Sequence, residues 1–411
     1  MTDCCSAPGL TPFHIALDQL LSQINVTQKT EQVALEHVCG RILAQDIISD
    51  VQIPSADNSA MDGYAIRSSD LVSVQTFLQV GKVFAGHPLD QRIEAGQCAR
   101  IMTGGQIPAG CDAVVMQENT QSQGDDITIL QTPAEGENIR RAGEDIRIGQ
   151  ILLRVGRRLT PADVGLLASL GVAQITVFQA VTVAVISTGD ELQKPGGELK
   201  PGQFYESNGY TVTALLERFG VKVINFGIVP DDIAVLRDTF LQADAQADVV
   251  VTSGGVSVGE ADYTKTVIEE IGRIDFWKLA IKPGKPFAFG HLPNSYVIGL
   301  PGNPVSALVT LHQLAVPMLR KISGQVAQQP LRLKAVTQGK LRKRPGRMDF
   351  QRGRFVISAA GDIEVQATGA QGSGILTSMS EANCYIVLPQ DSGSVEAGDV
   401  VMIEPFDSLL N

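Results

Sequence analysis

The stretch from residue 181 to residue 324 limits the fold most, because segments typical of strands alternate there with segments typical of helices. Its first strand, VTVAVIST at 181–188, is rich in Val and Ile and shows almost no alternation with polar residues. A strand of that kind is expected in a parallel sheet that is covered on both faces. The alternation therefore predicts a doubly wound parallel α/β domain, which we place at residues 181–328.

The segments on either side of this domain have a different character. Short β-like runs alternate with Gly, Pro and Asp turns over residues 51–149, and short strands return over residues 329–411. At about 150 residues per domain, a chain of this length corresponds to roughly two to four domains. We predict a discontinuous N-terminal domain at 1–50 and 150–180, an inserted β domain at 51–149 and a C-terminal β domain at 329–411.

Composition excludes several classes of protein. Lys and Arg number 33 against 44 acidic residues, a net charge of −11, which argues against a general nucleic-acid binder. The six cysteines form no CxxC pair and no cluster with zinc spacing, so they indicate reduced thiols. The N-terminus lacks the pattern of a signal peptide, and glycines, glutamines and β-branched residues interrupt the uncharged run 164–189. We therefore expect a cytoplasmic protein with neither a nucleic-acid nor a membrane partner.

The turns that follow the predicted strands are the candidates for a ligand site, because an open parallel sheet binds ligands beyond the carboxyl ends of its strands. Gly, Asp and Pro form ordinary turns as well, and one such turn alone is more often structural. Five such turns at one edge of the sheet favour a ligand site. They are Gly189–Glu191, Pro230–Asp232, Gly254–Glu260, Lys282–Pro286 and Pro301–Pro304.

The residue types in these turns suit a phosphate ester or anhydride. The candidate Mg²⁺ ligands are Glu191, Asp231, Asp232 and Asp262, and the glycine-rich loop SGGVSVG at 253–259 can bind phosphate through its N–H groups. Lys278, Lys282 and Lys285 add positive charge. Lys278 and Lys282 are four residues apart in what we predict to be one strand, so both are expected on one face of it.

Three further segments have two interpretations each. The segment 54–65, with Asp57 and Asp62, is a surface loop or part of a site, and Thr103 precedes a Gly pair that forms a turn or binds an anion. Residues 332–354 contain nine basic residues and one acid, Asp349. Such a run is a solvated charged face or a site for a polyanionic small ligand.

Taken together, the motifs resemble the MoeA family of molybdopterin molybdenumtransferases, which are related to the C-terminal domain of gephyrin. They occur in the family order, and they are DNSAMDGYA, IMTGG, NIRRAGED, STGDEL, TSGGVSVGEADY, KPGKP and GLPGNPVSA. The resemblance implies a MoaB/Mog-like α/β domain and insertion of molybdenum from molybdate into adenylylated molybdopterin, with Mg²⁺-dependent release of AMP. It also implies a homodimer whose site pairs the β domain of one chain with the α/β domain of the other. Further implied partners are the molybdopterin adenylyltransferase and the recipient molybdoenzymes.

The resemblance also carries residue roles, motif by motif. The implied catalytic residues are Asp62, Thr103, Glu191, Asp231 (or its neighbour Asp232), Lys278 and Lys282, with Glu191 and Asp231 as the Mg²⁺ ligands. The implied substrate-binding residues are Asp145, Ser253, Gly254, Gly255, Ser257, Gly259, Pro301, Pro304 and Ser373. Two positions depart from the family pattern: Ala56 replaces the usual Phe, and Glu206 replaces the usual Asp.

Two other functions are alternatives. A molybdopterin adenylyltransferase uses the same α/β domain but needs only about half of this chain and has no place for DNSAMDGYA. A non-catalytic dimeric scaffold, as gephyrin is at synapses, does not need the acidic and lysine residues that this chain retains.

Overall fold

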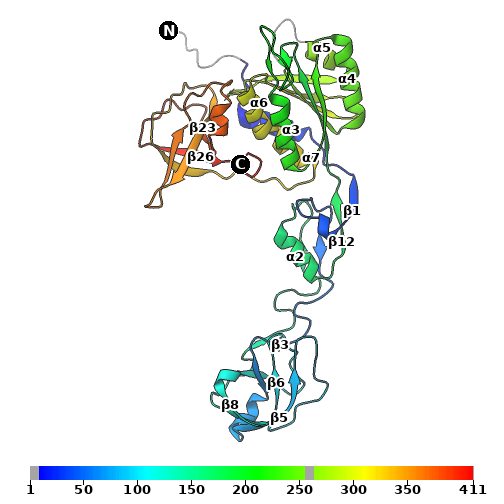
Figure 1. The fold of residues 1–411 in the computed structure, drawn as a ribbon, viewed down its shortest axis with the longest axis vertical. Coiled ribbons are helices and arrows are strands. Elements are labelled where there is room, and N and C mark those ends of the chain that lie inside the picture. The colour runs from blue at the N-terminus through cyan, green and yellow to red at the C-terminus, as the bar shows by residue number, and fades with distance from the viewer. Residues whose placement is uncertain (1–8, 255–262, 411) are drawn as a thin grey trace. The chain divides into compact units, whose positions relative to one another are not determined.

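The computed structural model describes residues 9–254 and 263–410, which divide into two compact units. One unit comprises 9–44, 156–160 and the described residues from 174 to 410; the other comprises 45–155 and 161–173. The larger unit is built on a six-stranded sheet (Figure 1). In sheet order its strands are β16 (Lys222–Val229), β13 (Thr182–Thr188), β17 (Val249–Ser253), β21 (Tyr296–Leu300), β20 (Pro286–His291) and β18 (Arg273–Lys278).

The doubly wound α/β domain is confirmed, but its sheet is mixed. Strands β16, β13, β17 and β21 are parallel, whereas β20 is antiparallel to both β21 and β18. We did not predict β20 as a strand. The short turn between His291 and Tyr296 explains its direction, because a parallel return would need a crossover of a dozen or more residues.

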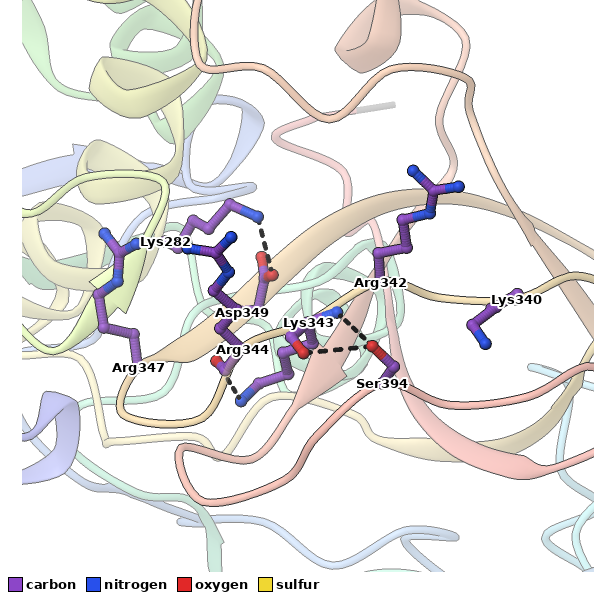
Figure 2. A pocket seen from close by; sticks show the side chains of 8 residues that line it. All are labelled: Lys282, Lys340, Arg342, Lys343, Arg344, Arg347, Asp349 and Ser394. Carbon is purple, nitrogen blue, oxygen red and sulfur yellow. Dashed lines mark hydrogen bonds and ion pairs between the residues drawn. The ribbon is translucent and has the colours of Figure 1, made fainter. Parts of the chain in front are cut away.

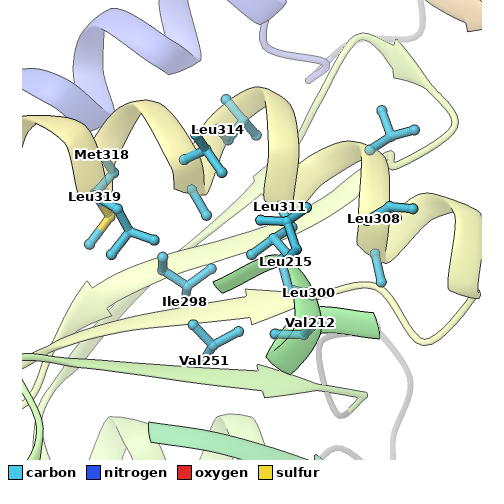
Figure 3. Packing of buried hydrophobic residues seen from close by; sticks show 14 of the residues in the cluster. Val212, Leu215, Val251, Ile298, Leu300, Leu308, Leu311, Leu314, Met318 and Leu319 are labelled. Carbon is cyan, nitrogen blue, oxygen red and sulfur yellow. The ribbon is translucent and has the colours of Figure 1, made fainter. Parts of the chain in front are cut away.

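Helices cover both faces of this sheet, as the buried strand β13 requires. Val183 and Val185 pack with α3 (Asn208–Phe219), α6 (Pro304–Thr310) and α7 (Val316–Ile322). Figure 3 shows other members of this core, among them Val251 and Ile298 of the sheet. The intervening Ala184 and Ile186 pack on the other face with α4 (Ile233–Gln246) and α5 (Tyr263–Ile271). Successive strand residues point to opposite faces, so a strand with both faces buried is apolar throughout.

The long helix that we expected at the end of this domain contains an irregular turn. A π-helical turn, η4 (Leu311–Ala315), separates α6 from α7. Pro317 lies near the start of α7. A proline has no N–H and its ring clashes with the carbonyl four residues earlier, so a wider turn immediately before it keeps the helix continuous.

The C-terminal strands form a ring. Strand β23 (Met348–Ile357) pairs with both β24 and β25, which closes the sheet, and β19 (Ile281–Lys282) adds to the edge of β23. Tyr385 and Phe350 belong to the same core as α6 and α7. The remaining elements of this part are β22 (Leu333–Thr337), β24 (Ile363–Ala367), α8 (Thr377–Ser380), β25 (Cys384–Leu388) and β26 (Val400–Pro405).

The larger unit also contains a helix and short strands from other parts of the chain. They are α1 (Phe13–Ser22), β1 (Thr30–Ala34), which pairs with β12 (Gln174–Phe178), the 3₁₀ turn η1 (Leu35–His37), and the parallel pair β14 (Leu192–Gln193) and β15 (Phe204–Tyr205).

The other unit is built on a six-stranded sheet of its own. In order, its strands are β7 (Ala113–Met116), β4 (Gly63–Ile66), β6 (Gln97–Ile101), β5 (Thr76–Val83), β9 (Asp126–Ile129) and β8 (Thr120–Gln123). Two short antiparallel pairs accompany it, β2 (Ile47–Ile48) with β11 (Ile151–Leu153) and β3 (Asn58–Ser59) with β10 (Ile139–Arg140). Its helical elements are α2 (Pro161–Ser169), η2 (Ser68–Val72) and η3 (Gln117–Asn119).

The core between the sheet and α6–α7 gives a first prediction. Ile298 is fully buried there, so Ile298→Ala should lower the free energy of unfolding by about 2–5 kcal/mol. Val235→Ala, on the exposed surface of α4, is the control and should change it by less than about 0.5 kcal/mol. Urea unfolding followed by the fluorescence of Trp277, the single tryptophan, measures both. Equal losses in the two variants would contradict the packing.

Candidate functional site

A pocket of about 640 Å³ lies at the carboxyl edge of the parallel strands. Glu191, Asp231 and Gly254 each follow a different strand, and all three line this pocket. The parallel register explains the grouping, since Thr188 lies opposite Val229, and Ser253 opposite both Ser187 and Leu300. Of the residues implied by the family motifs, the pocket brings together Glu191, Asp231, Ser253, Gly254, Pro301 and Pro304.

Two glycines allow the backbone to pack closely at this edge. Gly254 has a φ of +92°, and a Cβ there would lie 2.7 Å from the carbonyl oxygen of Thr188. Gly189 has a φ of +143°, and a Cβ there would lie 2.5 Å from a carboxylate oxygen of Glu191. Any other residue would strain the turn and displace its neighbour. The glycines after β13 and β17 therefore keep the pocket open and leave room for the Glu191 side chain.

The carboxylates of the pocket repel one another. Burial raises the pKa of Asp231, and the charges of Asp190 and Glu191 raise it further, against a hydrogen bond from the Asp190 backbone that lowers it. The Asp231 N–H in turn donates to Asp190 Oδ1 at 3.2 Å. The sequence left Asp231 and Asp232 as alternatives. In the structure the Asp232 carboxylate caps α4, where Oδ1 accepts from the N–H groups of Ala234 and Val235 at 2.9 and 3.0 Å. Asp231, which lines the pocket, is therefore the candidate ligand of the two.

The donor set fits a hard cation that shares its coordination with a substrate. Within residues 9–254 and 263–410, no group of three or more His, Cys, Asp or Glu is arranged to hold a metal ion. Mg²⁺ usually keeps several waters and binds through one or two carboxylates together with substrate phosphates. Glu191 and Asp231 can supply two such carboxylates. Burial and the neighbouring carboxylates raise the pKa of Asp231, and a bound cation would favour its ionised form.

The pocket also contains polar residues that the sequence did not single out as ligands. The hydroxyl groups of Thr188 and Thr264 are buried and have no hydrogen-bond partner in the part of the chain that the structure describes. Glu206, which the sequence flagged only as a departure from the family, is buried and accepts from the Gly209 N–H at 2.6 Å. The sequence pattern does not single out Thr188, because Thr188 is the last residue of β13 and the predicted site residues follow the strands.

The prediction that Lys278 and Lys282 share one strand is wrong. Strand β18 ends at Lys278, and Lys282 belongs to β19, which pairs with β23 of the C-terminal ring. Leu279, Ala280 and Ile281 are all fully buried, so the segment has no alternation of exposed and buried residues. Lys278 is exposed and lies opposite Pro286, which lines the pocket. The turn 282–286 is consequently not a fifth turn directly after a strand of the α/β sheet.

Lys282 instead lines a second cavity, of about 480 Å³, which we call the basic hollow (Figure 2). Its lining residues are Lys282, Lys340, Arg342, Lys343, Arg344, Arg347, Asp349 and Ser394. Lys282 Nζ lies 3.2 Å from Asp349 Oδ2, and the Asp349 side chain is almost fully buried. The basic run of the sequence therefore lines a cavity with one carboxylate among six cations.

Three more implied residues, Asp62, Thr103 and Asp145, lie in the unit that contains 45–155. Asp62 Oδ1 accepts from both the N–H and the hydroxyl of Thr103, each at 2.7 Å. The hydrogen bond from the Thr103 N–H lowers the pKa of Asp62 most, and the hydrogen bond from the Thr103 hydroxyl lowers it further. Asp145 is exposed, and its N–H donates to the carbonyl of Ile53.

The other implied residues are more dispersed. The carbonyl of Ser373 accepts from the Val305 N–H at 3.0 Å, which ties the loop before α8 to helix α6. Gly255, Ser257 and Gly259 lie outside the described residues, as does Asp262.

Comparison with known proteins settles the family. Residues 11–171 match the MoeA N-terminal region (domain I and II), 184–321 a probable molybdopterin binding domain, and 334–406 the MoeA C-terminal region (domain IV). The chain belongs to the MoeA family. A molybdopterin molybdenumtransferase of Haemophilus influenzae is 48% identical over 397 residues, which cover 96% of this chain and 98% of that protein.

Two further relatives agree with this MoeA membership. Gephyrin of Dictyostelium discoideum is 32% identical over 456 aligned residues, which cover 96% of this chain and 62% of that protein. The crystal structure of the molybdopterin biosynthesis moeA protein from Pyrococcus horikoshii OT3 matches with a TM-score of 0.84 and 32% identity, covering 97% of this chain and all of that one. In the described residues of this MoeA chain, no helix is long and apolar enough to cross a membrane.

The Asp62–Thr103 contact gives a second prediction. Thr103→Val removes the hydroxyl donor and keeps the backbone donor, so the pKa of Asp62 should rise but stay below its ordinary value of 3.8. This contact stabilises the folded protein at pH values above the ordinary pKa of an aspartate. The stabilisation is lost as the pH falls through the lowered pKa of Asp62. NMR titration of the carboxyl carbons measures the shift. Asp57, whose pKa is lowered by Ala142 and Arg141, should not change, and an unchanged Asp62 would contradict the assignment.

Proposed function

We propose that the protein inserts molybdenum into molybdopterin in the biosynthesis of the molybdenum cofactor, as a transferase. The observation that carries the proposal is the pocket in which Glu191 and Asp231 meet at the carboxyl edge of the α/β sheet. That pocket lies in the segment that matches a probable molybdopterin binding domain. Relatives that align over nearly the whole chain are molybdopterin molybdenumtransferases. The substrates we propose are adenylylated molybdopterin and molybdate.

The proposed reaction hydrolyses the phosphoanhydride of the adenylylated substrate. Water attacks phosphorus, the bridging P–O bond breaks, and AMP and a phosphate monoester of the pterin are formed. Mg²⁺ held by Glu191 and Asp231 would neutralise the charge that develops on the phosphate oxygens. Thr188 and Thr264 provide hydroxyl groups within the pocket, and Lys278 pairs in the strand register with Pro286, which lines it.

Two alternative functions have less support. An adenylyltransferase would need only the α/β domain, whereas this chain also matches the N-terminal and C-terminal regions of MoeA. A scaffold without catalysis does not need Glu191 and Asp231 to line one pocket, where the charge of Glu191 adds to the burial that raises the pKa of Asp231. We also propose the four-domain division, the homodimer, the cytoplasmic location, and contacts with the adenylyltransferase and the recipient molybdoenzymes.

The carboxylates give the third prediction. Glu191→Gln and Asp231→Asn should each lower AMP release and molybdenum insertion by about 100-fold, because charge stabilisation at the departing phosphate is lost. Glu217→Gln on the exposed side of α3 removes the same charge away from the pocket and should retain activity. Turnover with adenylylated molybdopterin, molybdate and Mg²⁺ is the assay. Near-normal turnover of Glu191→Gln at limiting Mg²⁺ would contradict the metal assignment.

The homodimer gives the fourth prediction. If Asp62 of one chain and Glu191 of its partner serve the same reaction, Asp62→Ala and Glu191→Ala should each be inactive alone. After subunit exchange, half of the dimers would be mixed, and each mixed dimer would hold one intact pair and one doubly altered pair. Activity should then return to about a quarter of the wild-type value. Confirmed mixed dimers without activity would exclude this partnership.

A further inference from the structure

Three exposed aromatic side chains line the pocket at the carboxyl edge of the α/β sheet, which we call the sheet-edge pocket. They are Phe204, Tyr205 and Tyr263, whose exposed fractions are 55%, 45% and 40%. Exposed apolar surface that gathers in one place is a common mark of a ligand-binding groove. Within the described part of the chain, none of the three rings contacts another aromatic ring. The pocket therefore offers aromatic surface that the protein does not use for its own packing.

Phe204 is held beside Glu191 by the backbone of β15. The Phe204 N–H donates to the Glu191 carbonyl at 3.0 Å, and Phe204 lies opposite Leu192 in the parallel pairing of β14 with β15. The Tyr205 hydroxyl donates to the Gly197 carbonyl at 2.8 Å, which ties the strand to the loop before it. The backbone that carries Phe204 is thus fixed next to a candidate metal ligand. A side chain on a fixed backbone loses less entropy when it binds a ligand.

The lining of the sheet-edge pocket carries negative charge. Its charged residues are Glu191, Glu206 and Asp231, and none of the described lining residues is Lys or Arg. In the proposed reaction the phosphate is therefore bound through Mg²⁺ and not through a cationic side chain of the lining. Other affinity for a nucleotide has to come from its uncharged part. An aromatic side chain binds the face of a base by stacking and needs no opposite charge to do so.

We propose that Phe204 stacks on the adenine of the adenylylated substrate and of the AMP product, and so gives the sheet-edge pocket its preference for a nucleotide. This inference rests on the proposed function. Of the two ring systems in that substrate, adenine belongs to the leaving group, which only has to be held and released. The pterin half must also meet molybdate. A stacking surface fixed beside Glu191 therefore suits the adenine.

Binding of AMP without turnover tests this contact. The intact protein is titrated by calorimetry, in the presence of Mg²⁺, with AMP and separately with ribose 5-phosphate, which has the same sugar and phosphate but no base. The wild type should bind AMP about tenfold more tightly than ribose 5-phosphate, because stacking adds to the affinity. Phe204→Ala should lower the affinity for AMP by about tenfold and change the affinity for ribose 5-phosphate by less than about twofold.

Two further variants separate stacking from a change of structure. Phe204→Trp keeps an aromatic face, so it should bind AMP at least as tightly as the wild type. The fluorescence of the added indole should be quenched by AMP and not by ribose 5-phosphate. Tyr210→Ala removes an exposed ring of α3 that does not line the pocket, and it should bind both ligands as the wild type does. Unfolding midpoints should not change in either alanine variant, because both rings are exposed.

Three results would overturn the proposal. They are an unchanged affinity of Phe204→Ala for AMP, an equal loss for AMP and ribose 5-phosphate, and an equal loss of AMP affinity in Tyr210→Ala. A titration with 6-hydroxymethylpterin adds a fourth. If Phe204→Ala lost affinity for this pterin and kept its affinity for AMP, the ring that stacks on Phe204 would be the pterin, against the proposal.

The proposed function can fail independently of this inference. A wild type that binds AMP with the expected dependence on Phe204, yet inserts no molybdenum, would contradict the proposed function and leave the stacking contact in place. Molybdenum insertion by a wild type that binds AMP no better than ribose 5-phosphate would contradict the stacking contact alone.

Discussion

The parallel register of strand β13 with its neighbours is the constraint on which the rest of the site depends. Because β13, β16, β17 and β21 run in one direction, the turns after all four strands meet at one edge. Glu191 and Asp231 are 40 positions apart in the sequence, yet they line one pocket because their strands are adjacent. Residues on both faces of β13 are buried, so a shift of register would misplace both cores and the turns together.

The C-terminal ring extends this arrangement beyond the α/β sheet. Strand β19 leaves the α/β region and pairs with β23, which brings Lys282 beside Asp349. One short segment, 282–286, thus borders a pocket rich in carboxylates at one end and a hollow rich in arginine at the other.

The sequence predicted what depends on local pattern and missed what depends on distant partners. The apolar strand 182–188 and the turn after it were predictable, because burial on both faces leaves a continuous Val and Ile run. The break between Lys278 and Lys282 was not, because the partner of β19 lies 67 positions further along the chain. The choice between Asp231 and Asp232 required helix-cap geometry. The hydrogen bonds between Asp62 and Thr103 join two motifs that the sequence shows only separately.

A crystal structure of the protein with AMP and Mg²⁺ tests the central claim most directly. The account predicts the metal between Glu191 and Asp231, and the phosphate of AMP in the same pocket beside the turn at Ser253 and Gly254. Well-ordered AMP and Mg²⁺ bound away from both carboxylates would contradict it.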